Sequence, residues 1–221
     1  MSEGGGAIVS RTFERFAGAC AALVALGGVG YAIAFVFTVR SAPRGAGYAS
    51  ALFLLGGGLV STVVMIAVYH RLRVTDPSFA LLGLLLGVAG ALGSSIHGGF
   101  DLALLVKRPA NSISNIGANP IDPRGLLTFG FTALALMVIG WLIIRGALLP
   151  KALGYLAVVG GVLLIVVYLG RLIVLNPKSP GLLTAAVISG FILSPAWFLW
   201  VGSILWRGQA EATATPVATP P

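Results

Sequence analysis

The chain has 221 residues, of which 57% are hydrophobic and only 9% are charged, and its formal net charge is +8. A soluble domain carries roughly 25% charged residues, so this composition excludes an ordinary soluble protein. The basic residues stand mainly between long apolar blocks, where they anchor helix ends at lipid headgroups, and they form no basic stripe with interleaved aromatics. We therefore expect the lipid bilayer as partner and no nucleic acid.

A membrane-spanning helix needs about 20 predominantly apolar residues. Six stretches reach this length, and they are Phe16–Val39, Tyr48–Tyr69, Phe79–Val106, Leu126–Ile144, Leu153–Leu175 and Leu182–Trp206. The segments between them contain Pro or Gly, as connections at a membrane surface do. The blocks lack the alternating pattern of a transmembrane β-barrel. We predict an all-α integral membrane bundle of six transmembrane helices, formed by residues 16–207.

The two ends of the chain, residues 1–15 and 208–221, are small and polar and are predicted to be disordered tails. Six spans place both ends on the same side of the membrane. That side receives seven basic residues and the opposite side six, and the longest polar connection, residues 107–125, falls on the less basic side. Both features favour cytoplasmic termini.

Lipid tails give helices no hydrophobic reason to associate, so helices approach closely where residues are small. Suitable positions are Gly27–Gly28, Gly56–Gly58, Gly83 with Gly87, and Gly160–Gly161. We predict that these glycines are helix contact points. With 31 glycines in the chain, they are no evidence of a dimer.

The third span carries His97 and Asp101, which lie four residues apart and therefore on one helix face. Counting the helical rise from Val106 puts Asp101 about 7–8 Å below the outer membrane boundary. The same count in the fifth span puts Arg171 about 6 Å below that boundary, with Tyr168 near the depth of His97. A charge inside a membrane helix costs about 2.5–3.5 kcal/mol. We predict that Asp101 and Arg171 face each other inside the bundle, with the other two side chains one layer below.

Three interpretations of this cluster stay open: a fixed ion pair that locks two helices, a ligand or proton site, or interfacial snorkelling. The sixth span adds Ser194–Pro195 near the depth of His97. Proline removes a helical hydrogen bond and frees the carbonyl of Phe191, which predicts a kink. Ser194 either borders the same cavity or satisfies the kinked backbone.

Several chemistries are not expected. The two histidines, His70 and His97, fall at opposite ends of their spans and cannot ligate one haem iron. The lone Cys20 builds no metal cluster, and His97 with Asp101 lacks a third zinc ligand. Ser194 has no G-x-S-x-G context for a hydrolase, and no phosphate-binding G-x-x-x-x-G-K-[ST] loop occurs. We expect no cofactor, no metal site and no catalytic residue.

From about Asp122 to Trp206 the sequence contains DPRGLLTFGF, RGALLPKALGYLAVVGG, YLGRLIVL and GFILSPAWFLWVGSILWR. In these segments it resembles the uncharacterised bacterial multi-spanning membrane proteins grouped as domain of unknown function 4386, or a close relative of them. The first three spans share only their hydropathy with that pattern. The resemblance implies a helical bundle in a bacterial plasma membrane, and it implies no activity.

For function, the sequence favours a non-enzymatic protein: a small-ligand binder, a sensor or an accessory subunit with a polar pocket in the outer half of the bundle. One alternative is a proton-coupled transporter that uses His97 and Asp101 as its relay. Another is a membrane enzyme that acts on a lipid-soluble substrate. The substrate, the oligomeric state and any protein partner are not encoded in a recognisable motif.

Overall fold

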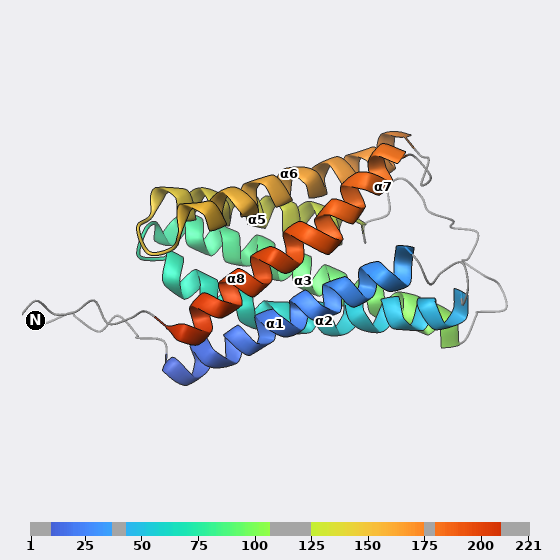
Figure 1. Ribbon diagram of the computed structural model, residues 1–221, viewed down its shortest axis with the longest axis horizontal. Coiled ribbons are helices and arrows are strands. Elements are labelled where there is room, and N and C mark those ends of the chain that lie inside the picture. Colours follow the sequence, from blue (N-terminus) through green and yellow to red (C-terminus); the bar gives the residue numbers. More distant parts are fainter. Residues whose placement is uncertain (1–9, 37–42, 107–124, 175–179, 209–221) are drawn as a thin grey trace, which may run out of the picture.

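The computed structural model describes residues 10–36, 43–106, 125–174 and 180–208, without the side chains of residues 35, 36, 43, 171–174 and 183. Within these ranges the secondary structure is helical and contains no strand (Figure 1). The elements in chain order are α1 (Arg11–Val36), α2 (Pro43–Leu72), α3 (Pro77–Val106), the π-helical segment η3 (Leu126–Phe131), α5 (Thr132–Arg145), α6 (Lys151–Val174), α7 (Pro180–Val187), the π-helical segment η4 (Ile188–Leu193) and α8 (Ser194–Arg207).

The segment η3 continues into α5, and α7, η4 and α8 follow one another without a break. The described elements therefore make six long helices, each apolar and long enough to cross a membrane. The predicted all-helical bundle of six apolar helices is confirmed. The loop over residues 107–124 and most of the two predicted tails lie outside the described residues.

The helices extend beyond the apolar blocks from which they were predicted. Helix α1 begins at Arg11, five residues before the predicted boundary at Phe16, because Ser10 caps it: the Ser10 hydroxyl accepts the N–H of Phe13 at 3.2 Å. Asp76 caps α3 in the same way and accepts two backbone N–H groups of the first turn at 3.0 and 3.1 Å. An apolar block marks the part of a helix that lies in hydrocarbon, whereas the cap marks where the helix begins.

The six helices form a closed ring. Each spanning helix packs against the next one in the sequence, and α8 packs against α1, while helices on opposite sides of the ring make few contacts. Figure 1 shows α1 and α8 crossing each other on the near side of the bundle. Packed helices lie about 8–10 Å apart. A six-membered ring with this spacing leaves an axial space as wide as one further helix, which side chains or a ligand must fill.

Among the described residues, large fully buried side chains gather at one end of this space. We call the end of the bundle that holds Arg11 and Arg207 the termini end, and the end that holds Arg44 and Val106 the far end. The fully buried large residues are Val64, Leu72, Leu142, Ile143, Leu153 and Leu205. All but the first lie within a few residues of the termini end, so the apolar core closes the ring there.

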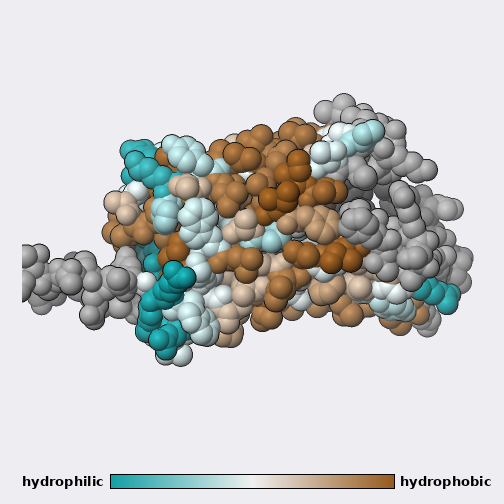
Figure 2. All heavy atoms as spheres, in the orientation of Figure 1, coloured by the Kyte–Doolittle hydropathy of each residue, from teal (hydrophilic) through white to brown (hydrophobic). Residues whose placement is uncertain are grey.

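The outer surface of the ring is apolar over its middle. Figure 2 shows hydrophilic residues gathered at the termini end and a broad apolar band beside them. Large apolar side chains on this surface are strongly exposed, for example Leu26 at 67%, Leu85 at 60% and Ile192 at 58%. Contiguous exposure on this scale is not tolerated in water. The band is the surface expected to face lipid, and the six apolar helices suggest a multi-pass membrane protein.

A buried ion pair joins α1 to α2 at the termini end. Arg71 is 8% exposed, its Nε donates to Oε1 of Glu14 at 3.0 Å, and its Nη2 lies 2.9 Å from the same oxygen. The sequence analysis assigned Arg71 to a surface connection, and this assignment is wrong. Helix α2 continues to Leu72, so Arg71 turns into the bundle and requires a counter-charge.

We expect Glu14→Ala to lower the free energy of unfolding by about 3 kcal/mol, because it leaves the buried Arg71 guanidinium without its partner. Arg71→Met removes both the charge and its need for a partner, so its cost should be smaller. Thermal unfolding in detergent measures both changes. Arg15→Met, at an exposed position one residue from Glu14, is the control and should change stability by less than about 0.5 kcal/mol. Equal stability of Glu14→Ala and the wild type would contradict the structural role of the pair.

Candidate functional site

The ring encloses a cavity of about 380 Å³. Residues from all six spanning helices line it; most come from the middle of a helix, and Thr128, Phe129 and Leu182 come from near the far end. The walls are mainly apolar side chains and glycines. The cavity therefore occupies the part of the axial space that the core at the termini end leaves unfilled.

Glycines account for much of this space. Gly27, Gly28, Gly57 and Gly160 line the cavity. A Cβ added at Gly28 or Gly57 would meet no atom within 4 Å, and one added at Gly27 or Gly160 would meet its nearest atom at 3.8 or 3.9 Å. For these positions the prediction of close helix contacts is wrong, because their missing side chains leave room inside the ring.

Other predicted contact glycines do pack closely. A Cβ added at Gly58 would lie 2.4 Å from a carbonyl oxygen of α3, and one added at Gly161 would lie 2.8 Å from a carbonyl oxygen of α5. At Gly83 and Gly87 the nearest side-chain atoms would be 3.1 and 2.7 Å away. The prediction is confirmed for these four glycines. The same residue type thus closes helix contacts in one place and opens a cavity in another.

The hydroxyl groups in the wall differ in how they are satisfied. Ser61 and Ser94 donate to carbonyl oxygens of their own helices at 2.8 and 3.1 Å. In contrast, Ser189 Oγ and Trp197 Nε1 are buried and have no hydrogen-bond partner. Ser189 is 5% exposed and Trp197 is 2% exposed. An unsatisfied buried donor costs about 1–3 kcal/mol, so these two groups require an explanation.

Two π-helical segments, η3 and η4, contribute to the cavity wall through Thr128 and Ser189. The sequence predicted a helix irregularity at Pro195, and η4 ends immediately before Ser194–Pro195. In Figure 1 the sixth span passes through this region as one continuous rod, so the irregularity is a widened turn. No sequence feature predicted η3. Single π-helical turns within α-helices occur frequently at functional sites.

His97 connects the cavity wall to the outside of the bundle. Its Nε2 lies 3.5 Å from Oδ2 of Asp101, and its Nδ1 lies 3.4 Å from the hydroxyl oxygen of Thr128. The side chains of Asp101 and His97 are 39% and 14% exposed, and Thr128 is buried and lines the cavity. With the proton on Nε2, the His97 Nδ1 accepts a hydrogen bond from the Thr128 hydroxyl, while Nε2 lies beside the Asp101 carboxylate. The Asp101 carboxylate, the His97 imidazole and the Thr128 hydroxyl thus form a line of polar groups that ends at the cavity wall.

The structure describes the side chains of four of the five residues in the predicted polar cluster. His97 contacts Asp101, and Ser194 lines the cavity. The Tyr168 ring packs beside two glycines of the fourth span, with ring carbons 3.7–3.8 Å from added Cβ positions. Arg171 belongs to the end of α6, but its side chain lies outside the described residues, so its pairing with Asp101 stays a prediction.

The sequence analysis did not identify Thr128, Ser189 or Trp197 as candidate site residues. The only signal for the first two is a hydroxyl group in an otherwise apolar stretch, which Ser61 and Ser94 share. Whether such a hydroxyl bonds to its own helix depends on the local helix type, and the sequence does not show π-helical turns.

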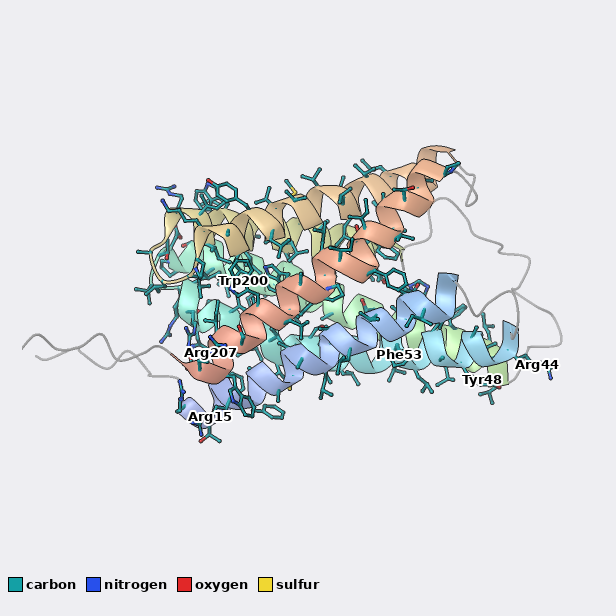
Figure 3. The ribbon with its side chains drawn as sticks, in the orientation of Figure 1. Arg15, Arg44, Tyr48, Phe53, Trp200 and Arg207 are labelled. Atoms are coloured by element: carbon teal, nitrogen blue, oxygen red, sulfur yellow. The ribbon has the colours of Figure 1, made fainter. Side chains whose placement is uncertain are left out.

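Phe53 marks where the cavity comes closest to the lipid-facing surface. It lines the cavity and is also 39% exposed. Figure 3 shows it between α1 and α2. Its ring lies against Gly30 of α1, where an added Cβ would come within 2.6 Å of a ring carbon. Phe53 therefore stands between the cavity and the outer surface of the bundle.

No protein-family model, no curated protein and no solved structure matches this chain. Function is therefore inferred from the site itself. Among the described lining residues there is no Asp, Glu, Lys, Arg or His. Apolar walls with a few hydrogen-bonding groups suit a neutral, largely apolar molecule and disfavour a charged one.

We expect His97→Ala and Thr128→Val to be coupled, because the two side chains share a hydrogen bond. A double-mutant cycle of unfolding free energies in detergent should give a coupling energy of about 0.5–1 kcal/mol. Thr62→Val is the control, since the Thr62 hydroxyl donates to its own helix at 2.6 Å on an exposed face of α2. It should be additive with His97→Ala. Additivity of His97→Ala with Thr128→Val would show that the contact contributes nothing.

Proposed function

We propose that this protein binds a small, lipid-soluble molecule inside its helical ring and acts as a membrane receptor, sensor or accessory subunit. The observation that supports this is the cavity of about 380 Å³ within a ring that is otherwise well packed. Small-molecule sites have volumes of about 300–1,000 Å³ and mostly apolar walls. Phe53 supplies an approach from the bilayer, in which such a molecule dissolves.

The distribution of packed and open regions favours binding over transport. In the described residues, Leu72, Leu142 and Leu205 belong to an apolar core that fills the termini end of the ring. A proton-coupled transporter needs a polar route that continues through that end. The His97–Asp101 contact lies on the far side of the cavity from this core, so a single-ended pocket fits the arrangement better.

The location proposed for this protein is a bacterial plasma membrane with cytoplasmic termini, in a relative of the family that the C-terminal half resembles. The support for the orientation is the small excess of basic residues on the side of the termini in the sequence, seven against six, of which Arg11, Arg15, Arg145, Lys151 and Arg207 are exposed. Figure 3 shows Arg15 and Arg207 together at the termini end and Arg44 at the other. Basic residues are enriched on the cytoplasmic side of membrane proteins.

Photolabelling tests the binding function. We expect an apolar probe, 3-phenyl-3-(trifluoromethyl)diazirine, to label the protein in lipid nanodiscs at two sets of residues. One set faces lipid, such as Leu26, and the other lines the cavity, such as Leu164 and Phe198. Peptide mass spectrometry separates the sets. Gly57→Leu fills the cavity and should remove the second set while leaving the first unchanged.

Gly56→Leu is the matched control. A Cβ at Gly56 also meets no atom within 4 Å, but Gly56 does not line the cavity, so both sets of adducts should remain. Gly28→Leu fills the cavity from α1 and repeats the test if Gly57→Leu fails to fold. Wild-type labelling restricted to lipid-facing residues, or cavity adducts that survive both filling substitutions, would overturn the proposal.

A further inference from the structure

The two hydrogen-bond donors in the cavity wall that lack a partner indicate which chemical group a ligand would need. Ser189 Oγ and Trp197 Nε1 belong to residues that line the cavity, both on the sixth span. Their neighbours in the same wall show that partners are normally found, since Ser61 and Ser94 use carbonyl oxygens of their own helices. Among the described lining residues, the buried donors without a partner therefore lie on the sixth span, whereas His70 Nδ1 and Arg71 Nη2, which also lack a hydrogen-bond partner, lie outside the cavity.

A structural reason exists for Ser189. A serine in an α-helix usually bonds to the carbonyl three or four residues earlier. Ser189 is the second residue of the π-helical segment η4, which interrupts the regular α-helical pattern, and its hydroxyl makes no such bond. Its hydroxyl is therefore available for another acceptor.

Trp197 is also unusual for its depth. Tryptophans of membrane proteins concentrate at the membrane–water interface, where the indole N–H reaches water or headgroups. Trp197 is 2% exposed and packs edge-to-face on Phe198, with ring centroids 5.1 Å apart. Its indole nitrogen is a donor only, so its partner must be an acceptor.

The remaining wall restricts the charge of the ligand. An anion would supply acceptors, but the described lining residues offer no basic side chain to pair with it. An unpaired charge in an apolar site is strongly unfavourable. A neutral carbonyl group supplies a strong acceptor without charge.

We propose that the ligand is a neutral, lipid-soluble carbonyl compound, whose oxygen accepts a hydrogen bond from Ser189 or Trp197. This inference rests on the proposed binding function. The two residues are eight positions apart, about 12 Å along a helix, so the cavity presents donors at two heights. A carbonyl group meets a donor at either height, while the apolar walls hold the rest of the molecule.

A shape-matched pair of competitors tests this inference. Dicyclohexyl ketone and dicyclohexylmethane differ only in a carbonyl group, and neither is excited at the wavelength that activates the diazirine. We measure the mole fraction of each compound in the nanodisc lipid that halves diazirine labelling of the cavity. In the wild type we expect the ketone to be effective at a roughly fivefold to tenfold lower fraction, the effect of about one hydrogen bond.

Ser189→Ala and Trp197→Phe should each reduce the preference for the ketone, and the double variant should abolish it. Ser61→Ala is the control for the serine, because Ser61 lines the same cavity but already donates to its own helix. Trp200→Phe is the control for the tryptophan, since Trp200 does not line the cavity and is 37% exposed (Figure 3). Neither control should change the preference.

Equal competition by the two compounds in the wild type would overturn the carbonyl assignment and leave the binding function intact, provided the cavity is labelled. A preference for the ketone that persists in the double variant would also overturn it, because a group other than these two donors would then bind the carbonyl oxygen. If the diazirine does not label the cavity at all, the proposed binding function is overturned, and the carbonyl assignment falls with it. The outcomes therefore separate the two proposals.

Discussion

The closed ring of six helices is the constraint on which the other features depend. With each helix packed on its two neighbours, no helix occupies the centre, and the axial space must be filled by side chains or by another molecule. At the termini end Leu72, Leu142 and Leu205 fill it. In the middle, where Gly28 and Gly57 stand instead, the space stays open as a cavity. The distribution of large and absent side chains along the ring thus sets where a ligand can lie.

Inside such a ring each polar group needs a partner, and the described side chains obtain theirs in several ways. Arg71 uses Glu14 from the neighbouring helix, and Ser61 uses its own backbone. His97 lies between a carboxylate and a hydroxyl. Against this background the two donors of the sixth span stand out, because the same surroundings satisfied comparable groups nearby.

Hydropathy was sufficient to predict the six helices, since the bilayer requires about 20 apolar residues from each of them. It misplaced helix ends, as at Arg11, because caps and polar first turns continue a helix beyond the hydrocarbon. It also predicted Arg71 at the surface, because hydropathy does not show which way a terminal residue turns. The cavity was not predictable, since a glycine in the sequence marks equally a close contact, as at Gly58, or open space, as at Gly57.

Lipid acyl chains compete with a ligand for a cavity in a membrane protein, because the acyl chains are as apolar as the cavity walls. Shape and apolar contact alone then discriminate weakly between a ligand and a lipid tail. Hydrogen-bond donors discriminate much better, since an acyl chain leaves them unsatisfied and a suitable ligand does not. Ser189 and Trp197 lie in the wall of the cavity that the glycines leave open. Their donors can therefore distinguish a ligand with an acceptor from an acyl chain without one. Under the proposed function, selectivity in this ring would depend on the few polar atoms of the cavity wall that have no partner in the protein.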